Sequence, residues 1–106
     1  MTDRIREEGA AVEGSAIVVS STGLHARPAI KLSRLARQFE SRIEVRVSGE
    51  GEWVDAKSIV RLMALRVASG QRLDFLARGK DAGPAITALS NLVGRNFDEP
   101  DGHAGD

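Results

Sequence analysis

The pattern of the chain changes at residues 22–29, where the sequence reads Thr22-Gly23-Leu24-His25-Ala26-Arg27-Pro28-Ala29. A β-branched run precedes this stretch and an amphipathic pattern follows it, which predicts that a helix begins here. Pro28 fits the first turn, where its missing N–H removes no helical hydrogen bond. The start of a helix presents unpaired N–H groups and the positive end of the helix dipole, so it favours an anion.

His25 gives this helix start a chemistry beyond binding, because a neutral imidazole is a nucleophile. Gly23 allows another part of the backbone to come close, and Arg27 can hold an anion with its planar set of donors. Phosphoryl transfer needs mainly positioning and charge stabilisation, which a site this small can provide if a partner protein supplies the rest. We therefore predict that a ring nitrogen of His25 accepts a phosphoryl group.

The composition excludes several other kinds of site. The chain has 106 residues, 42% of them hydrophobic and 28% charged, which predicts one ordinary globular domain. It contains no cysteine and only two histidines, His25 and His103, so we expect no disulfide, no metal site and no cofactor. Nothing resembles the nucleophile elbow of a serine hydrolase. Without a membrane-spanning run or a signal-peptide core, we expect a cytoplasmic protein that does not insert into the membrane.

The net charge of zero hides an uneven distribution of charge along the chain. Residues 1–14 and residues 98–106 each carry four acidic side chains, which leaves thirteen basic and seven acidic side chains between them. We expect a flexible acidic leader over 1–14, a folded domain over 15–97 and a disordered acidic tail over 98–106 that contains His103. Charge alone does not separate an acidic protein or a phosphate from nucleic acid as the ligand of the basic domain. We expect protein partners and no nucleic acid.

The hydrophobic pattern predicts an α+β domain, in which helices cover one face of a largely antiparallel sheet. Thr22 is a candidate cap for the first helix and Asp81 for the last. Trp53 is interpreted as a packing residue rather than a ligand-stacking one. The predicted elements are a strand at 16–20, a helix at 26–39, a hairpin of strands at 43–47 and 52–56, a helix at 58–67, a strand at 73–77 and a helix from 82 towards 97.

The first predicted helix has two different faces. Its core face gathers Ala29, Leu32, Leu35, Ala36 and Phe39, and its opposite face carries Arg27, Lys31, Arg34 and Gln38. Most charged stripes on helices are only solvated surface. This one begins beside His25, however, and Ile30 falls among the basic residues instead of the core. An exposed apolar residue within a positive stripe favours a docking surface.

The second predicted helix starts at Ser58, which we expect to be its N-cap. Its apolar residues cover most of the circumference: Ile59, Val60, Leu62, Met63, Ala64, Leu65 and Val67. Total burial of such a helix is difficult in a small domain. We therefore expect one side to face the core and the other to face a partner.

Two of these stretches carry a family resemblance. Gly23-Leu24-His25-Ala26-Arg27-Pro28-Ala29 resembles the active-centre signature of HPr, the histidine-containing phosphocarrier of the bacterial phosphoenolpyruvate-dependent sugar phosphotransferase system. Lys57-Ser58-Ile59-Val60-Arg61-Leu62-Met63-Ala64-Leu65 is similar to the second signature of that family, around its regulatory serine. The resemblance implies an open-faced β-sandwich, with a four-stranded, mostly antiparallel sheet covered on one face by three helices.

The resemblance also implies a function. His25 would accept the phosphoryl group from phospho-enzyme I and pass it to sugar-specific enzyme IIA components, with Arg27 stabilising the phosphate. Ser58 matches the serine that an HPr kinase/phosphorylase modifies in some bacteria. Such a protein is a monomeric carrier with a phosphohistidine intermediate, and whether it counts as an enzyme is uncertain because it is not an autonomous catalyst. The expected partner-binding residues are Ile30, Lys31, Arg34, Ile59, Val60, Arg61 and Met63.

Three functions remain open at this point. The first is the phosphocarrier, the second a regulatory paralogue whose phosphorylation at Ser58 gates protein binding, and the third a plain anion-binding domain without covalent chemistry. Members of the family also serve in nitrogen-related phosphorelays. Arg61 and Arg66 stand where many members have glycine, which is expected to alter partner preference or the response to Ser58 modification.

Overall fold

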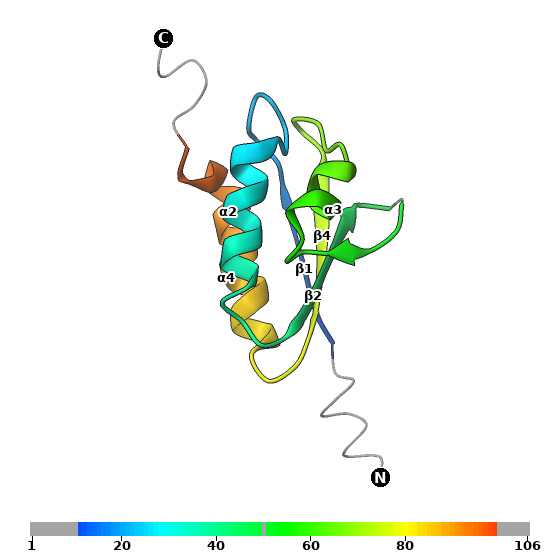
Figure 1. Ribbon diagram of the computed structural model, residues 1–106, viewed down its shortest axis with the longest axis vertical. Helices are drawn as coiled ribbons and strands as arrows, with labels where there is room; N and C mark the ends of the chain where they lie inside the picture. The colour runs from blue at the N-terminus through cyan, green and yellow to red at the C-terminus, as the bar shows by residue number, and fades with distance from the viewer. Residues whose placement is uncertain (1–10, 50, 100–106) are drawn as a thin grey trace.

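The computed structural model describes residues 11–49 and 51–99. These residues form four strands and three α-helices, followed by one turn of 3₁₀ helix (Figure 1). The predicted leader at 1–10, Glu50, and the predicted tail at 100–106 with His103 lie outside the described residues. In chain order the elements are β1 (Ala11–Ile17), α2 (Ala26–Ala36), β2 (Arg42–Val47), β3 (Val54–Asp55), α3 (Ile59–Ala64), β4 (Arg72–Arg78), α4 (Ala82–Gly94) and η1 (Asn96–Asp98).

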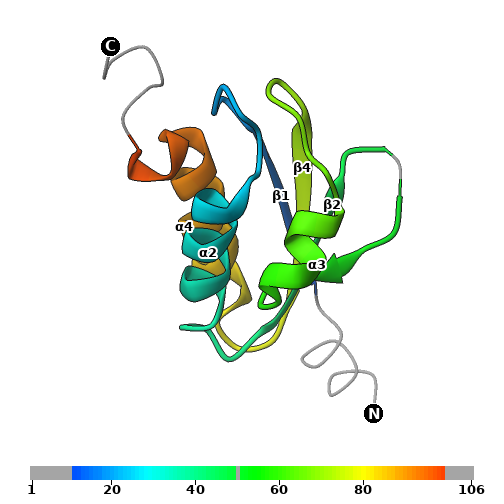
Figure 2. The same ribbon diagram turned by 45° about the horizontal axis from the view of Figure 1, so that its top comes forward.

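The strands form one antiparallel sheet in the order β1-β4-β2-β3. Helices α2 and α4 lie side by side against the sheet, and α3 packs beside α2 and β3 (Figures 1 and 2). The predicted α+β class, with an open four-stranded antiparallel sheet and three helices, is confirmed. None of the helices within the described residues is long and apolar enough to cross a membrane.

The core lies between the sheet and the helices, as the alternation along the strands predicts. On β4, Leu73, Phe75 and Ala77 are buried, and in the paired register Phe75 lies opposite Val45 of β2. Helix α2 contributes Ala29, Leu32 and Ala36 to the core, and α4 contributes Ala85, Ile86, Leu89, Leu92 and Val93. Burial of these side chains, rather than any single polar contact, holds the helices against the sheet.

Strand β1 begins earlier than the sequence predicts, at Ala11 instead of residue 16. The reason is that the first half of this edge strand has only one β-branched residue, Val12, and is interrupted by Gly14, so a search for a β-branched run misses it. At Gly14 an added Cβ would lie 2.5 Å from Cγ2 of Ile86. Residues 11–14, expected in the leader, therefore belong to the sheet. The predicted continuation to residue 20 is wrong, because β1 ends at Ile17, although the N–H of Val18 still donates to the Gln71 carbonyl at 2.8 Å.

Several ends and caps of the elements differ from the predictions. Helix α2 stops at Ala36 and α3 at Ala64, and β3 has only two residues. The N-cap of α2 is His25, while the hydroxyl of Thr22 lies 3.3 Å from that of Ser20. Asp81 is the N-cap residue of α4 but makes no capping hydrogen bond there.

Asp81 instead fastens α4 to the loop before β2. Its carboxylate accepts hydrogen bonds from the backbone N–H groups of Glu40 and Ser41, both at 2.9 Å, and from the Ser41 hydroxyl. The Ser41 hydroxyl and these N–H groups lower the pKa of Asp81, although desolvation opposes part of the shift. The Asp81 carboxylate therefore bonds to residues about forty positions earlier in the sequence instead of to the first turn of its own helix.

Candidate functional site

The loop that carries His25 is fixed by a backbone contact with the segment after α3. The N–H of Leu24 donates to the Val67 carbonyl at 3.0 Å, and Leu24 itself is buried. Gly23 has a φ of +72°, and an added Cβ there would lie 2.2 Å from the Val67 oxygen. Both facts require glycine at this position. The contact therefore holds the start of α2 beside the end of α3.

His25 is the N-cap residue of α2 and has an exposed side chain. Its carbonyl accepts the N–H of Ala29 at 3.0 Å, which closes the first turn, but its imidazole makes no capping hydrogen bond. The N–H groups of Ala26 and Arg27 come too early in the helix to have a helical acceptor, and Pro28 has no N–H. The first turn thus offers two backbone donors and an imidazole that is free of the capping role.

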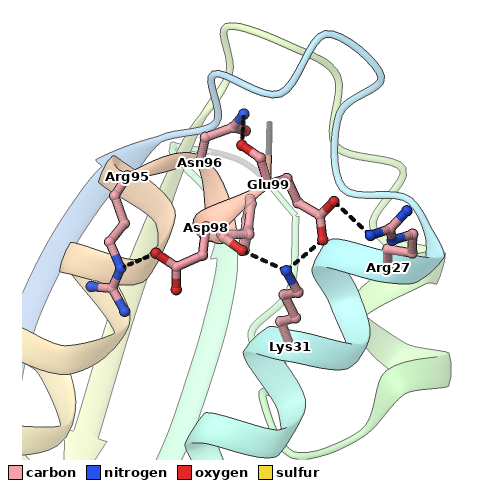
Figure 3. Close-up of polar contacts among 7 residues, drawn as sticks. Arg27, Lys31, Arg95, Asn96, Asp98 and Glu99 are labelled. Atoms are coloured by element: carbon pink, nitrogen blue, oxygen red, sulfur yellow. Dashed lines mark hydrogen bonds and ion pairs between the residues drawn. The ribbon is translucent and has the colours of Figure 1, made fainter. Parts of the chain in front are cut away.

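Arg27, two residues after His25, has a side chain that is 71% exposed. Its Nη2 lies 3.0 Å from Oε1 of Glu99, which arrives from beyond α4 (Figure 3). Lys31, one turn along α2, also forms an ion pair with the Glu99 carboxylate and donates to the Phe97 carbonyl at 2.9 Å. The two cations nearest His25 on α2 therefore share one carboxylate.

Helix α3 has the two different sides that its sequence predicts. Ser58 is the N-cap, and its hydroxyl accepts the N–H of Arg61 at 3.2 Å. Leu62 is completely buried, whereas Val60 is 77% exposed and Met63 42% exposed. The predicted cap and the core-facing side are confirmed. A partner for the exposed side stays a prediction.

The other expected docking residues do not all lie on the surface. Arg34 and Arg61 are exposed, while Lys31 and Ile59 are half-buried and Ile59 packs against the core. Ile30 is half-buried too, so it is less exposed than the sequence predicts, and its docking role stays a prediction.

Two features of the site were missed from the sequence. Glu99 was assigned to the tail, although its carboxylate reaches Arg27 and Lys31. Ser33 on α2 is buried and donates to the Lys57 carbonyl at 3.0 Å, which also accepts Arg37 Nε at 3.0 Å. Those two bonds fix α2 to the residue before Ser58. Neither contact has a periodic signal, because both join segments that are distant in sequence.

Arg66 has a backbone conformation that is unfavourable for its residue type. It follows α3 with a φ of +54°, a left-handed conformation that glycine adopts without strain and arginine does not. Arg66 is one of the two positions at which the sequence resemblance leads us to expect glycine in many members of the family. The strain lies next to Val67, whose carbonyl anchors the His25 loop.

Comparisons with known proteins agree with this geometry. The family model for the PTS HPr component phosphorylation site matches residues 12–95. The phosphocarrier protein NPr of Shewanella violacea is 36% identical over 88 residues, which are 83% of this chain and 94% of that protein. The multiphosphoryl transfer protein of Haemophilus influenzae is 39% identical over 93 residues, which are 87% of this chain.

The multiphosphoryl transfer proteins are much longer, and the chain spans about a fifth of their length, 18% in Haemophilus influenzae and 21% in Vibrio cholerae. Among solved structures, HPr from Thermoanaerobacter tengcongensis superposes with a TM-score of 0.76 at 38% identity, covering 83% of this chain and 97% of that one. The family match, the relatives and the shared fold lead to one conclusion. The chain belongs to the HPr family of phosphocarrier proteins.

Proposed function

We propose that His25 is the residue that carries the phosphoryl group, receiving it from phospho-enzyme I and passing it to enzyme IIA components of a phosphotransferase system. The observation that carries the proposal is the position of His25, exposed at the N-cap of α2 with an imidazole that makes no capping bond. A surface histidine elsewhere on the fold would lack both the helix-end donors and the adjacent Arg27. The protein acts as a monomer in this proposal, because one chain supplies all of these groups.

The transfer is a displacement at phosphorus between two histidines. A ring nitrogen of His25 attacks, the bond between phosphorus and the donor nitrogen breaks, and its electron pair returns to the donor ring. The proton that leaves the His25 ring and the one that the donor ring regains pass through solvent. The new phosphoryl dianion would be held by the planar donors of Arg27 and by the N–H groups of Ala26 and Arg27.

The exposed side of α3 supports a docking role for this surface. Val60 and Met63 are the two large apolar side chains that α3 exposes, and the contact between Leu24 and Val67 places this helix beside the His25 loop. Exposed Arg34 and Arg61 add positive charge around them, which favours an acidic partner surface. Enzyme I and enzyme IIA are proposed to bind here in turn, because each must bring its histidine to His25.

Ser58 is proposed as a regulatory site on the same surface. Its hydroxyl caps α3, so a phosphate there would add negative charge beside Val60 and Arg61. This modification by an HPr kinase/phosphorylase would oppose the docking of an acidic partner. Sugar transport and carbon regulation follow as proposed roles only if such partners act on this chain.

A second candidate function is a nitrogen-related phosphorelay. The similarity to the Shewanella violacea NPr, which covers 94% of that protein, favours it. The chemistry at His25 is the same in both cases, so the two functions differ only in the partner proteins. Parallel transfer assays with enzyme I of the sugar system and its nitrogen-related counterpart would separate them by rate.

The experiment for the proposed function is incubation with enzyme I and radiolabelled phosphoenolpyruvate. Wild-type protein should gain label that is stable in alkali and labile in acid, and His25→Ala should gain none. The variant His103→Ala is the matched control, because it removes the other histidine and should be labelled like the wild type. Absence of label on wild-type protein with a competent enzyme I would reject the proposal.

A further inference from the structure

The residue before the proposed regulatory serine is fastened to α2 by three hydrogen bonds. The carbonyl of Lys57 accepts the Ser33 hydroxyl and Arg37 Nε, each at 3.0 Å. The Lys57 ammonium donates in turn to the Phe39 carbonyl at 2.8 Å, just beyond the end of α2. The segment that leads into α3 is therefore held against the C-terminal end of α2, and the two helices pack together (Figure 2).

Asp55, the last residue of β3, fixes the same segment independently of α2. Its carboxylate accepts the N–H of Lys57 at 2.9 Å, and its carbonyl accepts the N–H of Ser58 at 3.1 Å. The backbone position of Ser58 is thus determined by bonds to both α2 and β3. A residue that is already ordered loses little conformational freedom when it makes a further contact.

Arg37 brings a positive charge to this segment. It is the C-cap residue of α2, and its side chain is exposed. Its Nε donates to the Lys57 carbonyl, whereas no described residue accepts a hydrogen bond from its two Nη atoms. A guanidinium carries five N–H donors on a planar fork. The Nη atoms of Arg37 can therefore bind a second acceptor while Nε keeps the first.

Covalent geometry brings this guanidinium within reach of the Ser58 side chain. The Lys57 carbonyl oxygen lies on the same side of its planar peptide as Cα of Ser58, and the Ser58 hydroxyl is two bonds farther on. Because Arg37 Nε is 3.0 Å from that oxygen, Ser58 Oγ lies within ~8 Å of Nε. A phosphate on Oγ and the Nη atoms of Arg37 each extend roughly 2 Å further. A change of side-chain rotamer then lets the two groups meet without movement of either helix.

We propose that Arg37 is the intramolecular ligand of a phosphate on Ser58, with Nε kept on the Lys57 carbonyl and the Nη atoms paired with phosphate oxygens. This inference rests on the proposed function, since it concerns the regulation proposed at Ser58. Arg61 is exposed near the same hydroxyl, but among the described residues no side-chain bond of Arg61 holds its guanidinium there. Phosphorylation of Ser58 thus adds a charge-assisted link between the start of α3 and the helix that begins after His25.

The first test measures the phosphate itself, in protein with phosphoserine installed at position 58 during synthesis. A ³¹P NMR titration gives the second pKa of that phosphate, which Arg37→Gln should raise by a few tenths of a pH unit because the dianion loses its cation. Arg37→Lys should also lie above wild type, since one ammonium cannot hold the Lys57 carbonyl and the phosphate as a fork does. Arg72→Gln, which removes an exposed arginine at the start of β4, is the control and should match wild type. A wild-type value equal to that of either Arg37 variant would overturn the proposal.

The second test observes the arginine directly by NMR of ¹⁵N-labelled arginine side chains. With phosphoserine at position 58, the Nη protons of Arg37 should exchange with solvent several-fold more slowly than in the unmodified protein, because they are hydrogen-bonded. Unchanged exchange at Arg37, or slowed exchange at Arg61 in its place, would overturn the proposal. Both tests use installed phosphoserine and no kinase. Failure of an HPr kinase/phosphorylase to modify Ser58 would instead reject the proposed regulation, so the two failures are distinguishable.

Discussion

The backbone N–H of Leu24 donates to the carbonyl of Val67 at 3.0 Å, and this bond joins the loop before α2 to the segment after α3. It connects the proposed phosphorylation site with the proposed docking helix, although the two partners are 43 positions apart in the sequence (67 − 24). Gly23 makes the bond possible, because any side chain there would collide with the Val67 carbonyl.

Gly23→Ala should therefore damage both stability and transfer. The added Cβ meets a backbone oxygen at 2.2 Å and the φ of +72° is unfavourable for alanine. The expected loss is about 2 to 4 kcal/mol in urea unfolding, since overpacking and a left-handed residue both contribute. Transfer to His25 should slow roughly tenfold or more, because the loop must shift. Gly49→Ala is the control: its φ is +78° but the space around it is empty, so it should lose only about 1 kcal/mol.

Ser58→Asp tests regulation without breaking the helix cap. Aspartate is a good N-cap residue, so the free energy of unfolding should change by less than about 0.5 kcal/mol. The new charge beside Arg61 and Val60 should slow transfer from phospho-enzyme I roughly tenfold if the partner surface is acidic. Ser58→Asn keeps the cap without the charge and should transfer like the wild type. Equal rates for the Asp and Asn variants would remove Ser58 from the regulatory proposal.

Arg27→Lys tests the phosphate contact. Lysine keeps the positive charge but loses the planar donors, so transfer should fall roughly tenfold. The Arg27 side chain is 71% exposed, and the midpoint of urea unfolding should hardly move. Arg78→Lys makes the same substitution on an exposed residue at the end of β4, outside the proposed docking surface, and should have no effect on transfer. A rate for Arg27→Lys that matches this control would count against Arg27 as the phosphate ligand.

The lowered pKa of Asp81 predicts that the protein loses stability in acid. Its pKa is lowered from an ordinary value of 3.8, so its contribution is complete above that pH and disappears as the pH falls through the lower folded value. Asp81→Asn should therefore be less stable than wild type at pH 7, with a difference that shrinks below about pH 4. Urea unfolding at a series of pH values measures this difference. A gap that stays constant from pH 7 to pH 2 would show that the Asp81 charge does not stabilise the fold.

The sequence predicts those strands and helices whose buried residues recur at a regular spacing. Leu73, Phe75 and Ala77 alternate along β4, and Leu32 lies on the core face of α2, as expected from 2-residue and 3.6-residue patterns. The start of α2 at His25 and the cap at Ser58 were also predictable, because their signals are local. The first half of β1 was not, since Gly14 lies close under Ile86, where an added Cβ would collide, and it interrupts the run of β-branched residues.

Contacts between distant segments account for the remaining errors. Asp81 has the right residue type for a cap, but its carboxylate bonds to Glu40 and Ser41, which no local pattern shows. Glu99 looked like part of an acidic tail, although Phe97 two residues earlier is buried and marks where the core ends. The hydrogen-bond partner of a polar side chain depends on the tertiary structure, so sequence periodicity does not predict which partner it takes.

The most direct measurement of the central claim is a phosphorus–nitrogen NMR experiment on protein with ¹⁵N-labelled histidine after reaction with enzyme I and phosphoenolpyruvate. We predict that one ring nitrogen of His25 becomes coupled to phosphorus, that the coupling disappears in His25→Ala, and that it persists in His103→Ala. Phosphorus bound to any residue other than His25, or no bound phosphorus with an active enzyme I, would contradict the claim.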